Sequence, residues 1–201
     1  MLPIPTRRPA LRLLCAGALL IAGIHLPAAA AEVAGVKFDD TATVAGKELK
    51  LNGAGLRTRF FIKVYAAGLY VPEKKANVAE LLREEGPRRV AIVMMHDVSA
   101  DTFSKAFMEG LNDNVDKTER TRLVPQITRF GQVFGMVENL KKGDVLHLDW
   151  IPGSGTQCEL NGRKLGEPIP DLAFYNAVLR IWLGDKPVDN SLKPALLGDA
   201  R

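Results

Sequence analysis

The stretch from Leu56 to Tyr65 alternates two kinds of side chain, and this alternation constrains the fold most. Read as one strand, it has two different faces, because neighbouring side chains in a strand point to opposite sides. One face carries Leu56, Thr58, Phe60, Ile62 and Val64, and the other carries Arg57, Arg59, Phe61, Lys63 and Tyr65. The preceding Gly53-Ala54-Gly55 predicts a tight turn. Such a strand belongs to a sheet whose basic face either meets water or lies under helices.

The remaining segments supply strands and helices in a definite order. Short alternating runs predict strands, and apolar residues recurring every three or four positions predict helices. Strands are expected at 36–44, 48–51, 90–98, 145–150 and 156–160, and helices after Asn77, after Ser99, across 123–140 (two adjacent helices or one bent helix) and across 171–183. Asn161-Gly162 predicts a hairpin turn. The order of strands, helices, strands and a last helix predicts an α+β domain, with a large antiparallel sheet and helices on one face.

The first 31 residues have the composition of a secretory signal peptide. Three arginines precede a short apolar run, and Pro27 is followed by alanines of the kind that signal peptidase requires. The run is shorter than the roughly 20 residues of a spanning helix, so we expect no membrane anchor once it is removed. Residues 32–201 are then expected to form a single domain in the periplasm or outside the cell.

Charge and cysteine content argue against several classes of function. Residues 1–31 hold three of the 27 Lys and Arg residues and none of the 23 Asp and Glu residues, so the remainder has a net charge of +1. This balance gives no basis for nucleic-acid binding. Cys158 is the one cysteine after residue 31, which excludes an internal disulfide. His96 and His147 lack neighbours at metal-ligand spacing, and no dinucleotide or phosphate-loop motif occurs, so we expect no metal or cofactor.

Arg57 is the strongest candidate for a binding group. If helices cover the basic face of its strand, the guanidinium lies in a partly apolar cleft, where it stays charged and needs an anion. A ligand carboxylate or oxyanion would supply that charge. The alternative is that the basic face is exposed to water, as one side of many antiparallel sheets is.

Several motifs resemble those of the chalcone isomerase superfamily, and the likeness extends over nearly all of residues 32–201. Gly53-Ala54-Gly55-Leu56-Arg57 and the run KVYAAGLY at 63–70 are similar to the glycine turn, arginine and strand that form the floor of that superfamily's ligand cleft. The segments at 153–156, 161–162, 176–188 and 191–193 resemble its secreted bacterial branch. The resemblance implies an open-faced β-sandwich, in which a layer of helices covers a large antiparallel sheet.

The resemblance also bears on catalysis. In chalcone isomerases an arginine holds the reacting phenoxide and stabilises developing negative charge, and Arg57 matches it. The resemblance implies a hairpin between Arg57 and Lys63, with Tyr65 on the following strand at the position of the family's threonine. The other hydrogen-bonding positions of the family are also filled differently here, by Phe103 (for tyrosine), Gly110 (for asparagine) and Ile181 (for threonine or serine). An intramolecular lyase with Arg57 as its main catalytic group is therefore an alternative and not the favoured function.

An arginine with a tyrosine at the threonine position is similar to the non-catalytic fatty-acid-binding members of the superfamily. The resemblance implies that Arg57 and Tyr65 hold a carboxylate in a cleft lined by Phe103, Phe107, Gly110 and Ile181. We therefore predict an exported protein that binds a small amphipathic carboxylate or an aromatic oxyanion without turnover. An interaction module with a filled cleft is a third possibility, and the sequence leaves the oligomeric state open.

Overall fold

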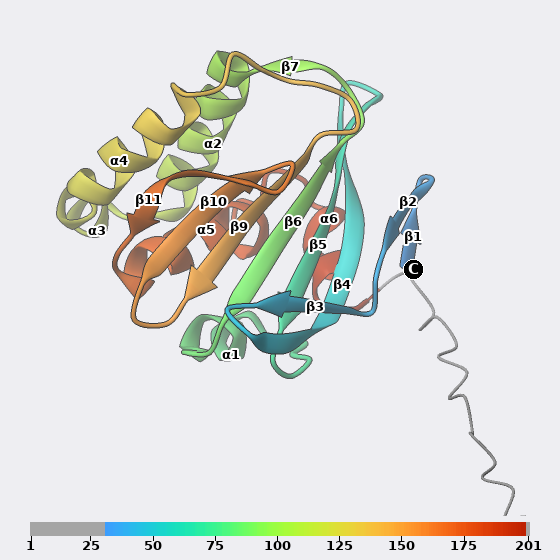
Figure 1. The fold of residues 1–201 in the computed structure, drawn as a ribbon, viewed down its shortest axis with the longest axis horizontal. Helices are drawn as coiled ribbons and strands as arrows, with labels where there is room; N and C mark the ends of the chain where they lie inside the picture. The colour runs from blue at the N-terminus through green and yellow to red at the C-terminus, as the bar shows by residue number, and fades with distance from the viewer. Residues whose placement is uncertain (1–30, 200–201) are drawn as a thin grey trace, which may run out of the picture.

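The computed structural model describes residues 31–199, which form one large antiparallel sheet with helices (Figure 1). The sheet has seven strands in the spatial order β11-β10-β9-β6-β5-β4-β3. Their bounds are β3 Thr41–Val44, β4 Lys47–Arg59, β5 Ile62–Val71, β6 Arg88–Met94, β9 Val145–Ile151, β10 Gly155–Leu160 and β11 Arg163–Ile169. The predicted signal peptide lies outside the described residues, apart from Ala31, which begins β1 (Ala31–Val33).

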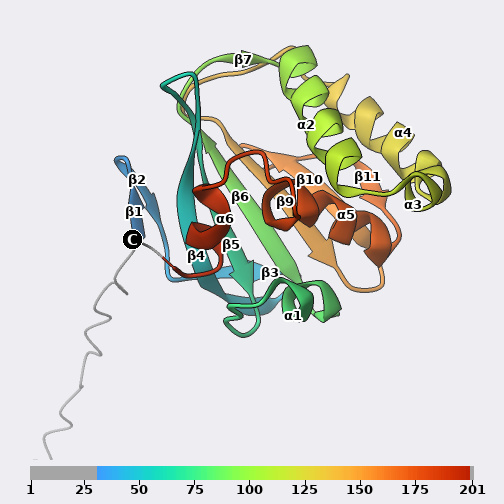
Figure 2. The ribbon, with the colours of Figure 1, turned by 180° about the vertical axis from the view of Figure 1, so that it is seen from behind.

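The main helices lie on one face of this sheet, as Figure 2 shows from behind. They are α1 (Val78–Arg83), α2 (Ala100–Asn114), α3 (Lys117–Arg122), α4 (Val124–Phe134), α5 (Leu172–Leu183) and α6 (Leu192–Leu196). The opposite face holds a smaller core with the pair of β1 and β2 (Val36–Phe38), and β7 (Val98–Ser99) pairs with β8 (Asn139–Leu140). The predicted α+β class and the layer of helices over an antiparallel sheet are confirmed.

Alternation along β5 explains how two cores form on the two faces. Tyr65 and Leu69 belong to the large core under the helices, whereas Ala66 and Tyr70 belong to the smaller core on the other face. Since side chains alternate along a strand, one strand supplies both layers. The helical face is thus the one that Tyr65 occupies.

The strand predicted from Leu56 to Tyr65 is wrong, because the chain reverses in its middle. β4 ends at Arg59 and β5 begins at Ile62, with Phe60 and Phe61 in the left-handed region at φ of 48° and 66°. In the sequence, basic residues keep to alternate positions on both sides of the turn, so the period does not reveal the reversal, and neither turn residue is the Asn or Gly that such turns favour. The pairing also shifts register between Arg57 and Thr58, so Ile62, predicted on the face opposite Arg59, pairs with Arg59. Arg57 pairs with Tyr65 across the two strands.

The turn predicted at Gly53-Ala54-Gly55 is also wrong, because these residues lie inside β4. The glycines are needed for close packing with α6. A Cβ on Gly55 would lie 2.7 Å from Ala195 Cβ and 2.8 Å from Leu192 Cδ1, and one on Gly53 would clash with the carbonyl oxygen of Ala195. Asn52 fixes the same contact by donating to the Leu196 carbonyl at 2.7 Å.

Local signals elsewhere in the sequence are confirmed. The Asn77 and Ser99 side chains accept from backbone N–H groups in the first turns of α1 and α2, as N-caps do. Asn161 and Gly162 form the turn between β10 and β11, with φ of 51° and 78°. The prediction of two adjacent helices or one bent helix across 123–140 is wrong, because that span holds the single helix α4, which ends at Phe134, and then the strand β8 at Asn139–Leu140. The neighbouring helix α3 ends at Arg122, before the predicted span begins.

Candidate functional site

Arg57 lies on β4, two residues after Gly55, and points to the face of the sheet that the helices cover. Its side chain is half-buried. Its guanidinium carbon lies 5.3 Å from the centre of the Tyr65 ring. Among residues 31–199 its Nε is buried without a hydrogen-bond partner, and no carboxylate forms an ion pair with it. A permanently charged group held in this way retains unused capacity to bind an anion.

Tyr65 lies directly opposite Arg57 and is buried. Its hydroxyl accepts a hydrogen bond of 2.8 Å from Trp182 Nε1 on α5, which leaves the hydroxyl hydrogen to donate elsewhere. Burial raises the pKa of Tyr65, and the neighbouring Arg57 and Trp182 counteract part of that rise. The phenol is therefore neutral and a hydrogen-bond donor at neutral pH.

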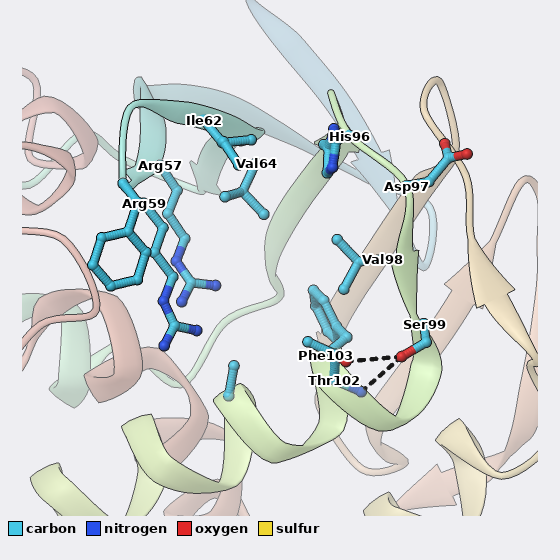
Figure 3. Close-up of a pocket in the computed structure, with 12 residues that line it drawn as sticks. Arg57, Arg59, Ile62, Val64, His96, Asp97, Val98, Ser99, Thr102 and Phe103 are labelled. Atoms are coloured by element: carbon cyan, nitrogen blue, oxygen red, sulfur yellow. Dashed lines mark hydrogen bonds between the residues drawn. The ribbon is translucent and has the colours of Figure 1, made fainter.

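A cavity of about 300 Å³, called the outer cavity here, opens between the β4–β5 hairpin and α2. Figure 3 shows Arg57 and Arg59 extending side by side from the hairpin toward α2, with His96 and Asp97 across the space. Apolar side chains from three segments form much of its wall, namely Ile62, Val64, Val98, Phe103 and Ala106. This combination of an apolar wall with few polar groups is typical of a small-molecule site.

A second space, called the inner cavity here, lies deeper beside Arg57 and is almost completely filled. It measures about 10 Å³ and is lined by Arg57, Tyr65, Phe103, Phe107, Ile181 and three further residues. Phe107 stacks on Phe130 with ring centres 4.2 Å apart. A space of this size holds about one water at most, so side chains must move before a ligand can reach the Tyr65 hydroxyl.

Gly110, the remaining predicted site residue, lies in a third space of about 290 Å³ that Arg57 and Arg59 also line. A Cβ on Gly110 would lie 2.9 Å from Ile181 Cγ2 and 3.0 Å from Val188 Cγ1, so its lack of a side chain lets α2 approach α5. The other five predicted residues therefore surround Arg57, but they are divided among three cavities.

Several residues beside Arg57 were missed from the sequence. Arg59 was assigned to the same strand face, which was a usable signal, yet it was not placed in the site. His96 and Asp97 reach the outer cavity from the segment before β7. Trp182 contacts Tyr65 over a separation of 117 residues, and no local pattern predicts a contact of that kind.

The histidines considered above do not gather with other ligands. His96 lines the outer cavity, whereas His147 lies on β9 with Nδ1 3.3 Å from Glu159 Oε1. Between residues 31 and 199, no group of three His, Cys, Asp or Glu side chains is placed to hold a metal ion. In the same part of the chain, no helix has the length and apolar character needed to cross a membrane.

Comparison with known proteins agrees with this architecture. The solved structure of a fatty-acid binding protein from Arabidopsis thaliana superposes with a TM-score of 0.66 and 16% identity, over 81% of this chain and 92% of that one. No curated protein sequence matches the chain. The sequence profile of the chalcone isomerase-like family matches residues 30–198. The chain therefore belongs to the chalcone isomerase-like family.

Proposed function

We propose that this protein is exported and binds a small amphipathic carboxylate, of the fatty-acid type, without converting it. The observation that carries the proposal is Arg57, a half-buried cation beside an apolar cavity that has no carboxylate partner within residues 31–199. A solved structure of the same fold, from a protein named as a fatty-acid binding protein, supports the proposal.

The anion is placed at Arg57 by elementary electrostatics. A guanidinium does not lose its proton, so partial burial must be balanced by an anion or by water. Its planar donor set matches a carboxylate, and a charge-assisted hydrogen bond is roughly twice as strong as a neutral one. An aromatic oxyanion has the same chemistry and is the second ligand class that this site accepts.

The chain of the ligand occupies the outer cavity in this proposal. Val64, Val98 and Phe103 offer it an apolar wall. Each methylene buried there contributes about 0.8 kcal/mol, so a chain of moderate length binds well even with a partly wet anchor. Tyr65 becomes a second donor to the carboxylate when the inner cavity opens.

Binding without turnover follows from the groups that surround Arg57. Three of the four further positions at which the family's enzymes have hydrogen-bonding side chains are here Phe103, Gly110 and Ile181, which pack in the interior and donate no side-chain hydrogen bond. The fourth is Tyr65, whose buried hydroxyl is engaged by Trp182. Arg57 alone supplies electrostatic stabilisation but no positioned proton transfer. Loss of chalcone absorbance on incubation with this protein, abolished in Arg57→Ala, would overturn the binding proposal in favour of a lyase.

Export to the periplasm or the medium is the second part of the proposal. It rests on the signal-peptide composition of residues 1–31. Expression of the full chain in a Gram-negative host, followed by fractionation and N-terminal sequencing, tests it. Cleavage close to Ala31 is the expected result, and an uncut chain in the cytosol would contradict it.

Two arginines of the same hairpin provide a matched test of the ligand site. Arg57→Ala is expected to weaken the binding of dodecanoate by about tenfold or more, because a charge-assisted hydrogen bond is worth about 1.5–3 kcal/mol. Arg59→Ala is expected to cause a much smaller loss, because Arg59 is exposed. Displacement of a fluorescent fatty acid from delipidated protein measures both, and equal losses would show that the wrong arginine is assigned.

A further inference from the structure

The tip of the β4–β5 hairpin, residues 59–63, exposes a cluster of large apolar side chains. Phe60 is 83% exposed, Phe61 is 100% exposed and Ile62 is 47% exposed. Figure 1 shows this hairpin extending beyond the end of the sheet, on the side where β7 lies. A projecting cluster of this kind is unusual on a water-exposed surface and indicates contact with another apolar phase.

The backbone of the tip is also unfavourable for the residues that it carries. Phe60 and Phe61 both have positive φ, a conformation in which bulky side chains are strained. The turn at Asn161-Gly162 has nearly the same φ values with residues that favour them. The chain thus has two turns with similar backbone conformations. One turn carries Asn and Gly, which favour this conformation, and the other turn carries two exposed phenylalanines. Strain retained at an exposed site suggests a function for the side chains.

Basic residues flank the tip, and within residues 31–199 no acidic side chain pairs with them. They are Arg59 and Lys63, and both are exposed. No acidic residue occurs from Arg57 to Val64. The Arg59 guanidinium carbon lies 5.5 Å from the centre of the Phe60 ring, so charge and aromatic surface are presented together. An apolar tip with cationic flanks complements the interface of an anionic membrane.

We propose that the tip of this hairpin docks on the surface of an anionic phospholipid bilayer. Phe60 and Phe61 enter the interfacial region, while Arg59 and Lys63 contact the lipid headgroups. A bilayer suits a projecting tip better than a protein does, because a protein partner would need a matching pocket. Arg59, Phe60 and Ile62 also line the outer cavity, so docking brings the mouth of that cavity to the lipid. The docking proposal does not depend on what the cavity binds.

Phe61→Gly is the decisive variant, because Phe61 lines none of the described cavities and glycine suits its φ of 66°. Residues 32–201 are sedimented with vesicles of phosphatidylglycerol and phosphatidylethanolamine. Wild type is expected to bind, and Phe61→Gly to lower the partition coefficient by about tenfold or more, since a buried phenylalanine is lost. Val124→Ser, at an exposed apolar residue on α4, serves as the control and is expected to bind as wild type.

Further measurements test whether the partner of the tip is an anionic membrane. The double variant Arg59→Gln/Lys63→Gln is expected to remove the preference for anionic over phosphatidylcholine vesicles. Failure of wild type to bind, or equal binding by Phe61→Gly, would overturn the proposal. So would sedimentation velocity showing a wild-type dimer that Phe61→Gly abolishes without any vesicle binding. Dodecanoate titration in vesicle-free buffer tests the ligand site separately, so failure of either proposal is recognisable.

Discussion

Tyr65 links the sheet to α5 through one buried hydrogen bond, and this bond also positions the hydroxyl beside Arg57. Trp182 Nε1 donates to the Tyr65 oxygen, and both side chains are buried. Indole has a single donor, and among residues 31–199 its acceptor is the Tyr65 oxygen alone, so the tyrosine satisfies a donor that would otherwise be buried without a partner. Strand, helix and binding residue are therefore coupled at this contact.

Tyr65→Phe is expected to destabilise the protein by about 1–3 kcal/mol, because it leaves the indole N–H buried without an acceptor. Trp182→Phe removes the donor as well and is expected to rescue part of that loss in the double variant. Urea unfolding of the two single variants and the double variant measures the coupling. Strictly additive losses would contradict a direct bond between the two side chains.

At the scale of elements, the two hairpins show what the sequence could and could not predict. The β10–β11 turn was predicted because Asn161-Gly162 has the residues that its backbone favours. The residue pattern does not predict the β4–β5 turn, because two phenylalanines occupy left-handed positions and local preference opposes the observed structure. Only the family resemblance implies that Tyr65 lies on the strand after that of Arg57. In the docking proposal, the two phenylalanines are kept for their contact with lipid and not for the turn, which explains why conformational preference did not predict the turn. The turn predicted at Gly53 and Gly55 is also wrong, because these glycines serve close packing against α6, which is distant in the sequence.

Gly55→Ala is expected to destabilise the protein by about 1–3 kcal/mol, because the new methyl group enters the space of Leu192 and Ala195 on α6. Gly131→Ala is the matched control. It lies in α4 with open space around the Cβ position, so the same change is expected to stabilise by up to about 1 kcal/mol. Thermal unfolding compares the two. A neutral Gly55→Ala would show that α6 does not need this close approach.

At the scale of the whole molecule, the fold was predictable and the shape of the site was only partly so. The order of strands and helices indicates an antiparallel sheet with one helical layer. Arg57 and Tyr65 were predicted on the same side, but the structure places them there by pairing them across the hairpin and not by alternation along one strand. Filling of the inner cavity was not predictable, because Phe107, Ile181 and Trp182 reach it from two helices through side-chain packing. Packing of this kind depends on tertiary geometry and leaves no local pattern.

The pH dependence of global stability has an identifiable contribution from His147. Burial lowers its pKa below the ordinary value of 6.5, and Arg89 lowers it further. The unfolded chain therefore binds a proton first as the pH falls, so this contribution is complete above pH 6.5 and is lost at lower pH. Wild type is expected to lose more unfolding free energy than His147→Gln between about pH 7.5 and 5. Parallel urea-unfolding curves across that range would contradict this assignment.

The central claim is that Arg57 recognises the charge of a ligand whose chain lies in the outer cavity. Dodecanoate and 1-dodecanol have the same chain but differ in charge, so their affinity ratio isolates that recognition. Calorimetric titration of delipidated wild type is expected to show a preference for the acid of about tenfold or more, and Arg57→Ala a ratio near one. An equal preference for the acid in both proteins would contradict the account.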